Sequence, residues 1–300
     1  KEQPMNRLLE GDDGSGKTVV ATMAALMAIA QGWQVALMAP TELLARQHAD
    51  TVHALLKPLG EEDVVAILVG SLSASQKAKA RQAIADGKAR LIVGTQALIQ
   101  EQVHMDKLAI VIIDEQHRFG VDQRKALMIK AGHMPHVLNM TATPIPRSLA
   151  LTLYGELDIS VLKEKPKGRL PIETKIVSPN SVADVYSSID NQLEDGQQMF
   201  VVCPLIEESS VLEANSAEKT YEDLSKKVFK NRKVGLLHGR MKSAEKQDIM
   251  QRFVDRKLDI LVSTTVIEVG VDVPNATIMM IESAERFGLA QLHQLRGRVG

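Results

Sequence analysis

The stretch "RLLEGDDGSGKTVVATMAALMAIAQG", residues 7–32, decides the fold. Its first residues, "RLLEG", predict a short strand, and "TVVATMAALMAIAQG" predicts a helix that ends at Gly32. The loop between them, "GDDGSGKT" (residues 11–18), fits the pattern G-x-x-x-x-G-K-[ST]. A strand, a glycine-rich loop and a helix in this order are typical of a phosphate-binding loop. A glycine turn that only caps the helix is the alternative.

This loop predicts ATP and Mg²⁺ as cofactors. Main-chain N–H groups from Gly14 to Thr18 would face the phosphates, Lys17 would reach the β and γ oxygens, and Thr18 would hold the metal. Asp12 and Asp13 occupy positions whose side chains can point to solvent, so we expect binding to survive, with a lower affinity if a carboxylate points inward. The residues expected to bind the nucleotide are Gly11, Asp12, Asp13, Gly14, Ser15, Gly16, Lys17 and Thr18.

The composition predicts a soluble globular protein. The 300 residues are 45% hydrophobic and 24% charged, which suits about two domains. The apolar stretches are far shorter than the roughly 20 residues that cross a bilayer, so we expect no membrane contact. The chain starts without a secretory signal, and its single cysteine, Cys203, excludes an internal disulfide, which together favour a cytoplasmic location. A net charge of −1 gives no overall electrostatic attraction to nucleic acid.

Apolar strands alternate with helical segments along the whole chain, which predicts an α/β fold with parallel sheets. The alternation stops at "KEKPKGRLPIE" (residues 163–173), so we expect one domain over 1–162 and a second over 163–300. The expected strands are residues 34–40, 63–70, 90–95, 108–114 and 136–143 in the first domain, and 198–204, 233–239, 259–264 and 277–283 in the second.

Two acidic residues follow a strand in "VIIDEQH" (residues 111–117). Open α/β sheets bind ligands at the carboxyl ends of their strands. Asp114 could therefore hold Mg²⁺ through water, while Glu115 orients and deprotonates an attacking water. A simple acidic turn is the alternative.

Further motifs resemble, in order, those of the superfamily 2 helicases and translocases. They are "PTELLARQH" (40–48), "DEQH" (114–117), "TATPIPR" (141–147), "STTVIEVGVDVP" (263–274) and "QLHQLRGRVG" (291–300). Within this superfamily, "DEQHRFGV" (114–121), "LIEES" (205–209), "LLHGRMKSAEK" (236–246) and "GLAQLHQLRGRVG" (288–300) resemble the helicase core of the RecG-type ATP-dependent DNA helicases. The resemblance covers essentially the whole chain and implies two tandem RecA-like domains, each a mostly parallel sheet flanked by helices.

The resemblance also implies roles for residues outside the loop. Gln116 and His117 would link the hydrolysis site to the second domain, and Thr141 and Thr143 would couple nucleotide state to DNA binding. Gly270 and Asp272 would close over the nucleotide, and Gln294 would complete the site. Arg298 would neutralise charge that develops on the γ-phosphoryl group. The expected catalytic residues are Lys17, Asp114, Glu115, His117, Gln294 and Arg298, with Thr18 and Asp114 at the metal.

Aromatic residues make up only 3% of the chain, which favours contacts with the phosphate backbone over base stacking and hence a duplex translocase. For each candidate contact a helix cap or a surface role is the alternative. These candidates, placed by motif position, are Thr41, Arg46, Gly94, Thr95, Gln96, Arg240 and Thr264. Neither His238 nor Cys203 has the neighbours of a zinc site, and Cys203 is expected to pack in the core.

These expectations describe an ATP-dependent DNA helicase or double-strand translocase core that remodels branched DNA in repair and recombination. The chain resembles part of a longer protein, in which flanking regions would recognise junctions and bind replication or repair proteins. One alternative is the core of a transcription-repair coupling translocase, which shares "HRFGV" (117–121) and "FGLAQLHQLRGRVG" (287–300). An alternative from another class is a binding switch that ATP controls with little turnover.

Overall fold

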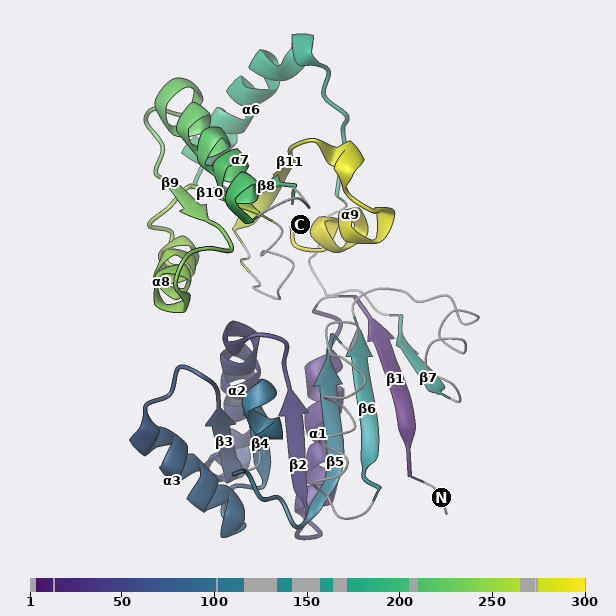
Figure 1. The fold of residues 1–300 in the computed structure, drawn as a ribbon. Helices are drawn as coiled ribbons and strands as arrows, with labels where there is room; N and C mark the ends of the chain where they lie inside the picture. Colours follow the sequence, from purple (N-terminus) through teal and green to yellow (C-terminus); the bar gives the residue numbers. More distant parts are fainter. Residues whose placement is uncertain are drawn as a thin grey trace. The chain divides into compact units, whose positions relative to one another are not determined.

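The computed structural model describes residues 4–12, 14–100, 102–115, 134–141, 157–163, 172–204, 210–264, 273 and 275–299. The chain divides into two compact units, Lys1–Lys167 and Gly168–Gly300 (Figure 1). The expectations for Asp13, Gln116, His117, Thr143, Gly270 and Asp272 lie outside the described residues. Among the described helices, none combines the length and the apolar character that a membrane span needs.

The first unit is built on a parallel sheet with the strand order β3-β4-β2-β5-β6-β1-β7 (Figure 1). Its strands are β1 (Asn6–Gly11), β2 (Gln34–Met38), β3 (Val65–Leu68), β4 (Leu91–Gly94), β5 (Leu108–Asp114), β6 (His136–Thr141) and β7 (Asp158–Leu162). Every residue of β2 is buried, as expected of a strand covered on both faces. The strand β7 was not predicted. It lies at the edge of the sheet, and Asp158 at its start pairs with Arg7 at 3.0 Å.

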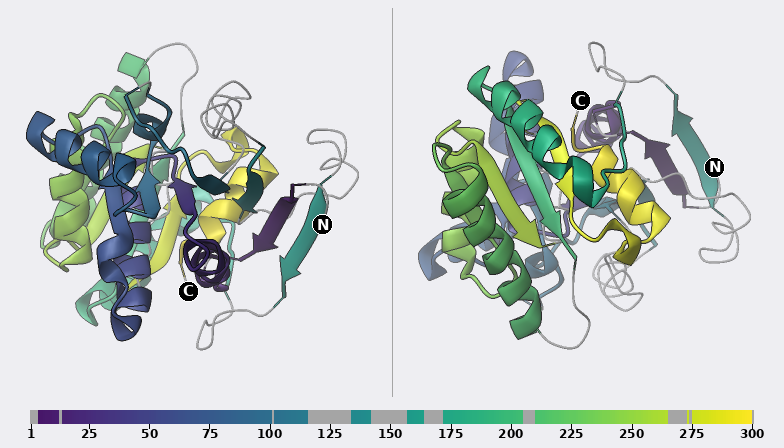
Figure 2. Two further views of the ribbon diagram at one scale, coloured as in Figure 1. Left: turned by 90° about the horizontal axis from the view of Figure 1, so that it is seen from below. Right: turned by 90° about the horizontal axis from the view of Figure 1, so that it is seen from above.

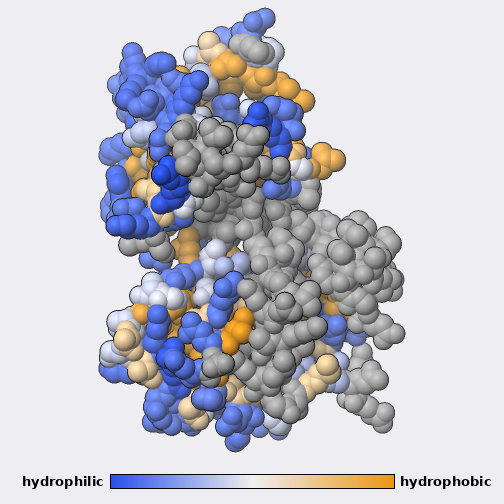
Figure 3. Space-filling view, viewed as in Figure 1, coloured by the Kyte–Doolittle hydropathy of each residue, from blue (hydrophilic) through white to orange (hydrophobic). Residues whose placement is uncertain are grey.

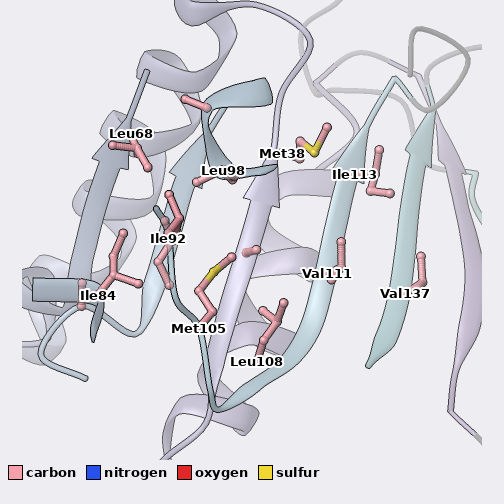
Figure 4. Packing of buried hydrophobic residues seen from close by; sticks show 14 residues of the cluster. Met38, Leu68, Ile84, Ile92, Leu98, Met105, Leu108, Val111, Ile113 and Val137 are labelled. Atoms are coloured by element: carbon pink, nitrogen blue, oxygen red, sulfur yellow. The ribbon is translucent and has the colours of Figure 1, made fainter. Parts of the chain in front are cut away.

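Helices cover both faces of this sheet. They are α1 (Lys17–Ile29), α2 (Glu42–Leu56) and α3 (Ala74–Ala85), with short 3₁₀ helices η1 (Lys57–Leu59), η2 (Glu62–Val64) and η3 (Gln96–Ile99). Helices α1 and α2 pack against each other and against the sheet. Figure 4 shows a cluster of buried side chains on the face that carries α3, which extends from Ile84 past Ile92 and Met38 to Val111 on β5. The apolar strands thus build a core on either side of the sheet.

The second unit has a smaller parallel sheet, with the order β11-β8-β10-β9. Its strands are β8 (Gln198–Cys203), β9 (Val234–Leu237), β10 (Ile260–Thr264) and β11 (Ala276–Ile281). Its helices are α6 (Val182–Glu194), α7 (Ser210–Asp223), α8 (Ser243–Val254) and α9 (Leu289–Arg296), with short helices η5 (Pro179–Ser181), η6 (Leu224–Val228) and η8 (Ala284–Arg286). Helices α6 and α7 share a core with β8 and β10 and can be followed in Figure 2. The predicted α/β class is therefore confirmed for both units.

The two units repeat one another in detail. The strand order β3-β4-β2-β5 of the first sheet has the same form as β9-β10-β8-β11 of the second. At the start of β2, Gln34 Nε2 donates to one carbonyl at the end of α3 and to one just before β4, at 2.8 and 3.2 Å. At the start of β8, Gln198 Nε2 donates to the carbonyls of Phe253, at the end of α8, and Leu258, before β10, both at 2.7 Å. A buried amide thus joins the same elements in each unit.

A second shared feature is a lysine that closes the loop before a helix. Lys77 Nζ in α3 donates to the carbonyl of Gly70 at 2.6 Å, and Lys246 Nζ in α8 donates to the carbonyl of Gly239 at 2.7 Å. In both units the lysine follows its glycine by seven positions. The repeat therefore extends from the sheets to the loops at their edges.

On the face of the molecule drawn in Figure 3, the described residues are largely hydrophilic.

Candidate nucleotide and nucleic-acid sites

The first sheet brings three of the predicted motifs to one edge. We call this edge, where the parallel strands end, the carboxyl edge. Strands β5, β6 and β1 are neighbours there, with Asp114 opposite Met140 and Thr141 opposite Glu10 (Figure 1). Glu10 directly precedes the loop, which begins at Gly11. The acidic pair, the coupling motif and the phosphate-binding loop therefore follow three adjacent strands.

The loop has a backbone that glycine permits. Gly14 and Gly16 have φ values of 76° and 93°, in the left-handed region that side chains disfavour. A Cβ on Gly11 would lie 2.5 Å from Ser15 Oγ and 3.0 Å from Leu162 Cβ, so a side chain there would require these neighbours to move. Gly16 is the N-cap of α1, and the helix has neither a side-chain cap nor an acidic residue in its first turn. The start of α1 thus presents N–H groups suited to an anion.

Lys17 lies back across this loop. Its Nζ donates to the carbonyls of Gly11 and Asp12, at 2.7 and 3.0 Å, and the residue is buried. Ammonium groups bind anionic oxygens more strongly than neutral carbonyls. The next residue, Thr18, is half-buried at the first turn of α1. The loop, its lysine and the helix start therefore fit a triphosphate.

The acidic pair after β5 is buried. Asp114 and Glu115 are each 7% exposed. One carboxylate oxygen of Asp114, Oδ1, accepts a hydrogen bond from the main-chain N–H of Glu115 at 3.1 Å, and the other, Oδ2, lies 2.7 Å from His48 Nε2. Glu115 has a φ of 49°, an uncommon conformation for a residue other than glycine, of the kind found at functional sites.

These acids fit a magnesium ion that is shared with phosphates. Mg²⁺ takes hard oxygen ligands and usually binds through one or two carboxylates together with substrate phosphates and water. Within the described part of the chain, no group of three or more metal-ligating side chains stands ready to hold an ion alone. The donor set present, Asp114 with Thr18 near the loop, suits such a shared site.

His48 is a member of this site that the sequence analysis missed. It lies in α2, is 8% exposed, and its Nε2 lies 2.7 Å from Oδ2 of Asp114. The signal was present in the sequence, because Leu44, Ala45 and Val52 bury the same face of α2. A histidine within an apolar helix face needs a polar partner. Sequence alone did not identify that partner, which lies 66 positions away.

The candidate DNA contacts of the first unit gather near the carboxyl edge. Thr41 caps α2 by accepting a hydrogen bond from the N–H of Leu44 at 3.4 Å, and Arg46 Nη2 donates to Ser71 Oγ at 3.2 Å. Thr95 is half-buried and Gln96 is exposed. For Gly94, packing alone explains the glycine, because a Cβ there would lie 2.2 Å from the carbonyl oxygen of Leu68. Thr141, predicted to couple the sites, is 1% exposed.

In the second unit the candidate residues have different environments. Arg240 is exposed after β9, whereas Thr264 at the end of β10 is 1% exposed, and its Oγ1 makes no hydrogen bond to the part of the chain that the structure describes. Gln294 lies in α9. Arg298 follows α9, is half-buried, and its main-chain N–H donates to the carbonyl of Leu295 at 3.0 Å.

Cys203 and His238 are explained by structure. Cys203 is fully buried at the end of β8, and burial raises the pKa of its thiol to about 11. A thiol in such a state is a poor nucleophile. His238 Nε2 lies 3.7 Å from Glu218 Oε1 on the neighbouring helix α7. The core-packing interpretation of Cys203 therefore agrees with its environment.

Comparisons with known proteins cover both units. The chain matches the family model "DEAD/DEAH box helicase" over residues 2–152 and "Helicase conserved C-terminal domain" over residues 181–300. It is 56% identical over 305 residues to the ATP-dependent DNA helicase RecG of Escherichia coli (strain K12), covering 99% of this chain and 43% of that protein. The RecG of Aquifex aeolicus is 52% identical over 301 residues, with 100% of this chain and 38% of that protein covered.

A solved structure of RecG bound to a three-way DNA junction has the same fold. Its TM-score is 0.80 at 47% sequence identity, and the match covers 100% of this chain and 38% of that one. The chain thus spans less than half the length of each of these RecG proteins.

Proposed function

The chain belongs to the DEAD/DEAH box helicase family, in the branch of the RecG proteins, and we propose that it forms the motor core of an ATP-dependent DNA helicase. In this proposal the core hydrolyses ATP and moves along duplex DNA to remodel branched DNA in repair and recombination. The observation that carries the proposal is the carboxyl edge, where the phosphate-binding loop and the acidic pair follow strands separated only by β6.

We propose that the loop binds ATP and that Lys17 exchanges its two carbonyl partners for phosphate oxygens. This exchange is favourable because both carbonyls are neutral, whereas the phosphates are charged. Thr18 and Asp114 would hold Mg²⁺, which neutralises negative charge on the β- and γ-phosphates when it is bound. Asp12 and Asp13 are predicted to lie beside the nucleotide, where their main chain would help to shape the loop.

Hydrolysis would depend on a base and on cations around the γ-phosphate. Glu115, buried beside Asp114, would accept the proton of the attacking water. Arg298 would contribute a guanidinium from the second unit, with Gln294, Gly270 and Asp272 beside the nucleotide. The roles of His117 in catalysis, and of Gln116, Thr141 and Thr143 in coupling, stay predictions of the same kind.

The repeat between the units supports paired contacts with the DNA backbone. Thr95 and Thr264 follow or end the equivalent strands β4 and β10, so two contacts of one kind would face the phosphates from the two units. Arg46 and Arg240 would add positive charge. Gly94 and Gln96 stay predicted neighbours of the backbone. DNA duplexes and branched junctions are the proposed partners, with a cytoplasmic location, and repair proteins would bind elsewhere in the longer protein.

The alternatives are less well supported. The relatives described above and the solved structure that matches the whole chain carry the name RecG, so a core for transcription-repair coupling is not favoured. A binding switch with little turnover is not favoured either, because those relatives are named as ATP-dependent helicases.

A junction assay on the whole protein tests this function. A three-way DNA junction with a fluorophore and a quencher on two strands reports remodelling as a rise in fluorescence. We expect the rise with ATP and Mg²⁺, and no rise with ATP omitted or in the Lys17→Met variant. Lys88→Met removes an exposed lysine and serves as the matched control. A junction that stays intact in the presence of ATP, although the protein binds both ATP and the junction, would refute the proposal.

A further inference from the structure

We infer that His48 is a positioning residue, which fixes the Asp114 carboxylate and connects it to the DNA-facing start of α2. The inference rests on the proposed function, in which Asp114 holds Mg²⁺ and α2 carries the DNA contacts Thr41 and Arg46. The histidine itself would touch neither the metal nor the DNA.

The first step is the geometry at the carboxylate. His48 Nε2 lies 2.7 Å from Oδ2 of Asp114, and the Glu115 N–H lies 3.1 Å from Oδ1. A carboxylate that binds a metal is ionised and can only accept hydrogen bonds, so Nε2 must carry the hydrogen. The terminal torsion of aspartate has a broad energy minimum, so a carboxylate is free to turn unless its oxygens are held. Here a separate donor holds each oxygen.

The second step is burial. His48 is 8% exposed and Asp114 is 7% exposed, so water competes little for this hydrogen bond. A buried carboxylate that loses its donor keeps the full cost of its lost hydration. The pair therefore stabilises one orientation of Asp114.

The third step is the position of α2. Its N-cap, Thr41, and its first turns lie near the loop after β3, where Arg46 donates to Ser71. Arg46 and His48 are two positions apart, which places them on opposite sides of the helix, roughly 200° apart. One side of the helix thus carries Arg46, a predicted DNA contact, and the other faces Asp114. A shift of α2 on DNA binding would move the donor of the metal ligand.

Partners that orient a metal ligand typically contribute 10-fold to 100-fold to metal affinity or activity. The test therefore measures magnesium-dependent nucleotide binding as well as turnover. The affinity of the whole protein for a fluorescent ADP analogue is measured once with Mg²⁺ and once with EDTA. We call the ratio of these two affinities the magnesium gain. Its ATP turnover is then measured with and without duplex DNA.

Three variants separate positioning from folding. His48→Leu keeps the volume but removes the donor, so we expect the magnesium gain to fall by about 10-fold or more, with a smaller DNA stimulation. His48→Gln keeps an amide donor at a similar reach, so it should restore most of both. His53→Leu changes an exposed histidine of the same helix and should behave as the wild type.

Each outcome decides. An unchanged magnesium gain in folded His48→Leu overturns the inference, and so does an equal loss in His53→Leu. If His48→Leu fails to fold, His48→Asn is measured instead, because its shorter side chain cannot bring the amide as close to Asp114. A magnesium gain equal to that of the wild type in His48→Asn overturns the inference, and a reduced magnesium gain supports it. A wild-type protein that binds magnesium nucleotide without DNA stimulation refutes the proposed function instead, while the magnesium gain still tests His48.

Discussion

Lys17 and Gly11 lie at the two ends of one loop, and the ammonium of Lys17 donates to the carbonyl of Gly11 at 2.7 Å. The contact folds the lysine over the place where the loop would hold phosphates. It ties the side chain at the start of α1 to the end of β1, so the lysine is already near its proposed ligand. Nucleotide binding then needs an exchange of partners and no large search by a flexible side chain.

Replacing this ammonium should weaken nucleotide binding. In Lys17→Met the apolar stem remains, but the charge-assisted hydrogen bonds to phosphate are lost, at about 1.5–3 kcal/mol each. We expect the affinity for a fluorescent ADP analogue to fall by at least roughly 10-fold, measured by equilibrium titration. Lys88→Met, at an exposed position, should bind normally. Equal affinity in Lys17→Met would mean that the loop holds the nucleotide in another way.

The close approach of β3 to β4 predicts a stability difference between two glycines. A Cβ on Gly94 would lie 2.2 Å from the Leu68 carbonyl oxygen, so Gly94→Ala must push the strands apart. We expect about 1–3 kcal/mol of lost stability, measured by denaturant unfolding. Gly239→Ala is the matched control, because, apart from its chain neighbours, no described residue has an atom within 4 Å of the added Cβ. Equal stability of the two variants would contradict the packing role of Gly94.

How much the sequence could predict depended on how local the signal was. The strand that became β2 and the loop 11–18 are local patterns, and the structure has them where the patterns predicted. Strand β7 was missed because edge strands are only partly buried and lack a continuous apolar run. His48 was missed because its role depends on Asp114, which is distant in sequence. The left-handed backbone of Glu115 likewise depends on tertiary structure.

The repeated glutamine predicts matching defects in the two units. Gln34 and Gln198 each donate to two buried carbonyls, so a leucine in either place leaves both without that donor. We expect Gln34→Leu and Gln198→Leu each to lower the free energy of unfolding by about 1–3 kcal/mol. Gln192→Leu, whose amide makes an exposed 3.4 Å contact, should change little. A loss in only one of the two units would contradict their equivalence.

The buried environment of Cys203 predicts that its thiol reacts slowly with alkylating reagents. Burial raises its pKa from 9.0 to about 11, so at pH 8 the folded protein holds roughly 100-fold less thiolate than the unfolded chain. Alkylation followed by mass spectrometry should show that difference in rate. The thiol of the unfolded chain ionises above pH 9, whereas the buried thiol of the folded protein stays neutral up to about pH 11. Burial of the neutral thiol therefore contributes fully to stability below pH 9, and this contribution declines as the pH rises toward 11. Rapid labelling of the native protein at pH 8 would contradict the buried position.

The most direct test of the central claim is steady-state ATP hydrolysis by the whole protein, measured with increasing duplex DNA. The account predicts turnover that rises with DNA. In Glu115→Gln it predicts normal ADP binding with a turnover reduced by about 100-fold to 10,000-fold, because the buried base is lost. An ATP turnover that does not change with the DNA concentration, or a Glu115→Gln variant that hydrolyses ATP as fast as the wild type, would contradict the central claim.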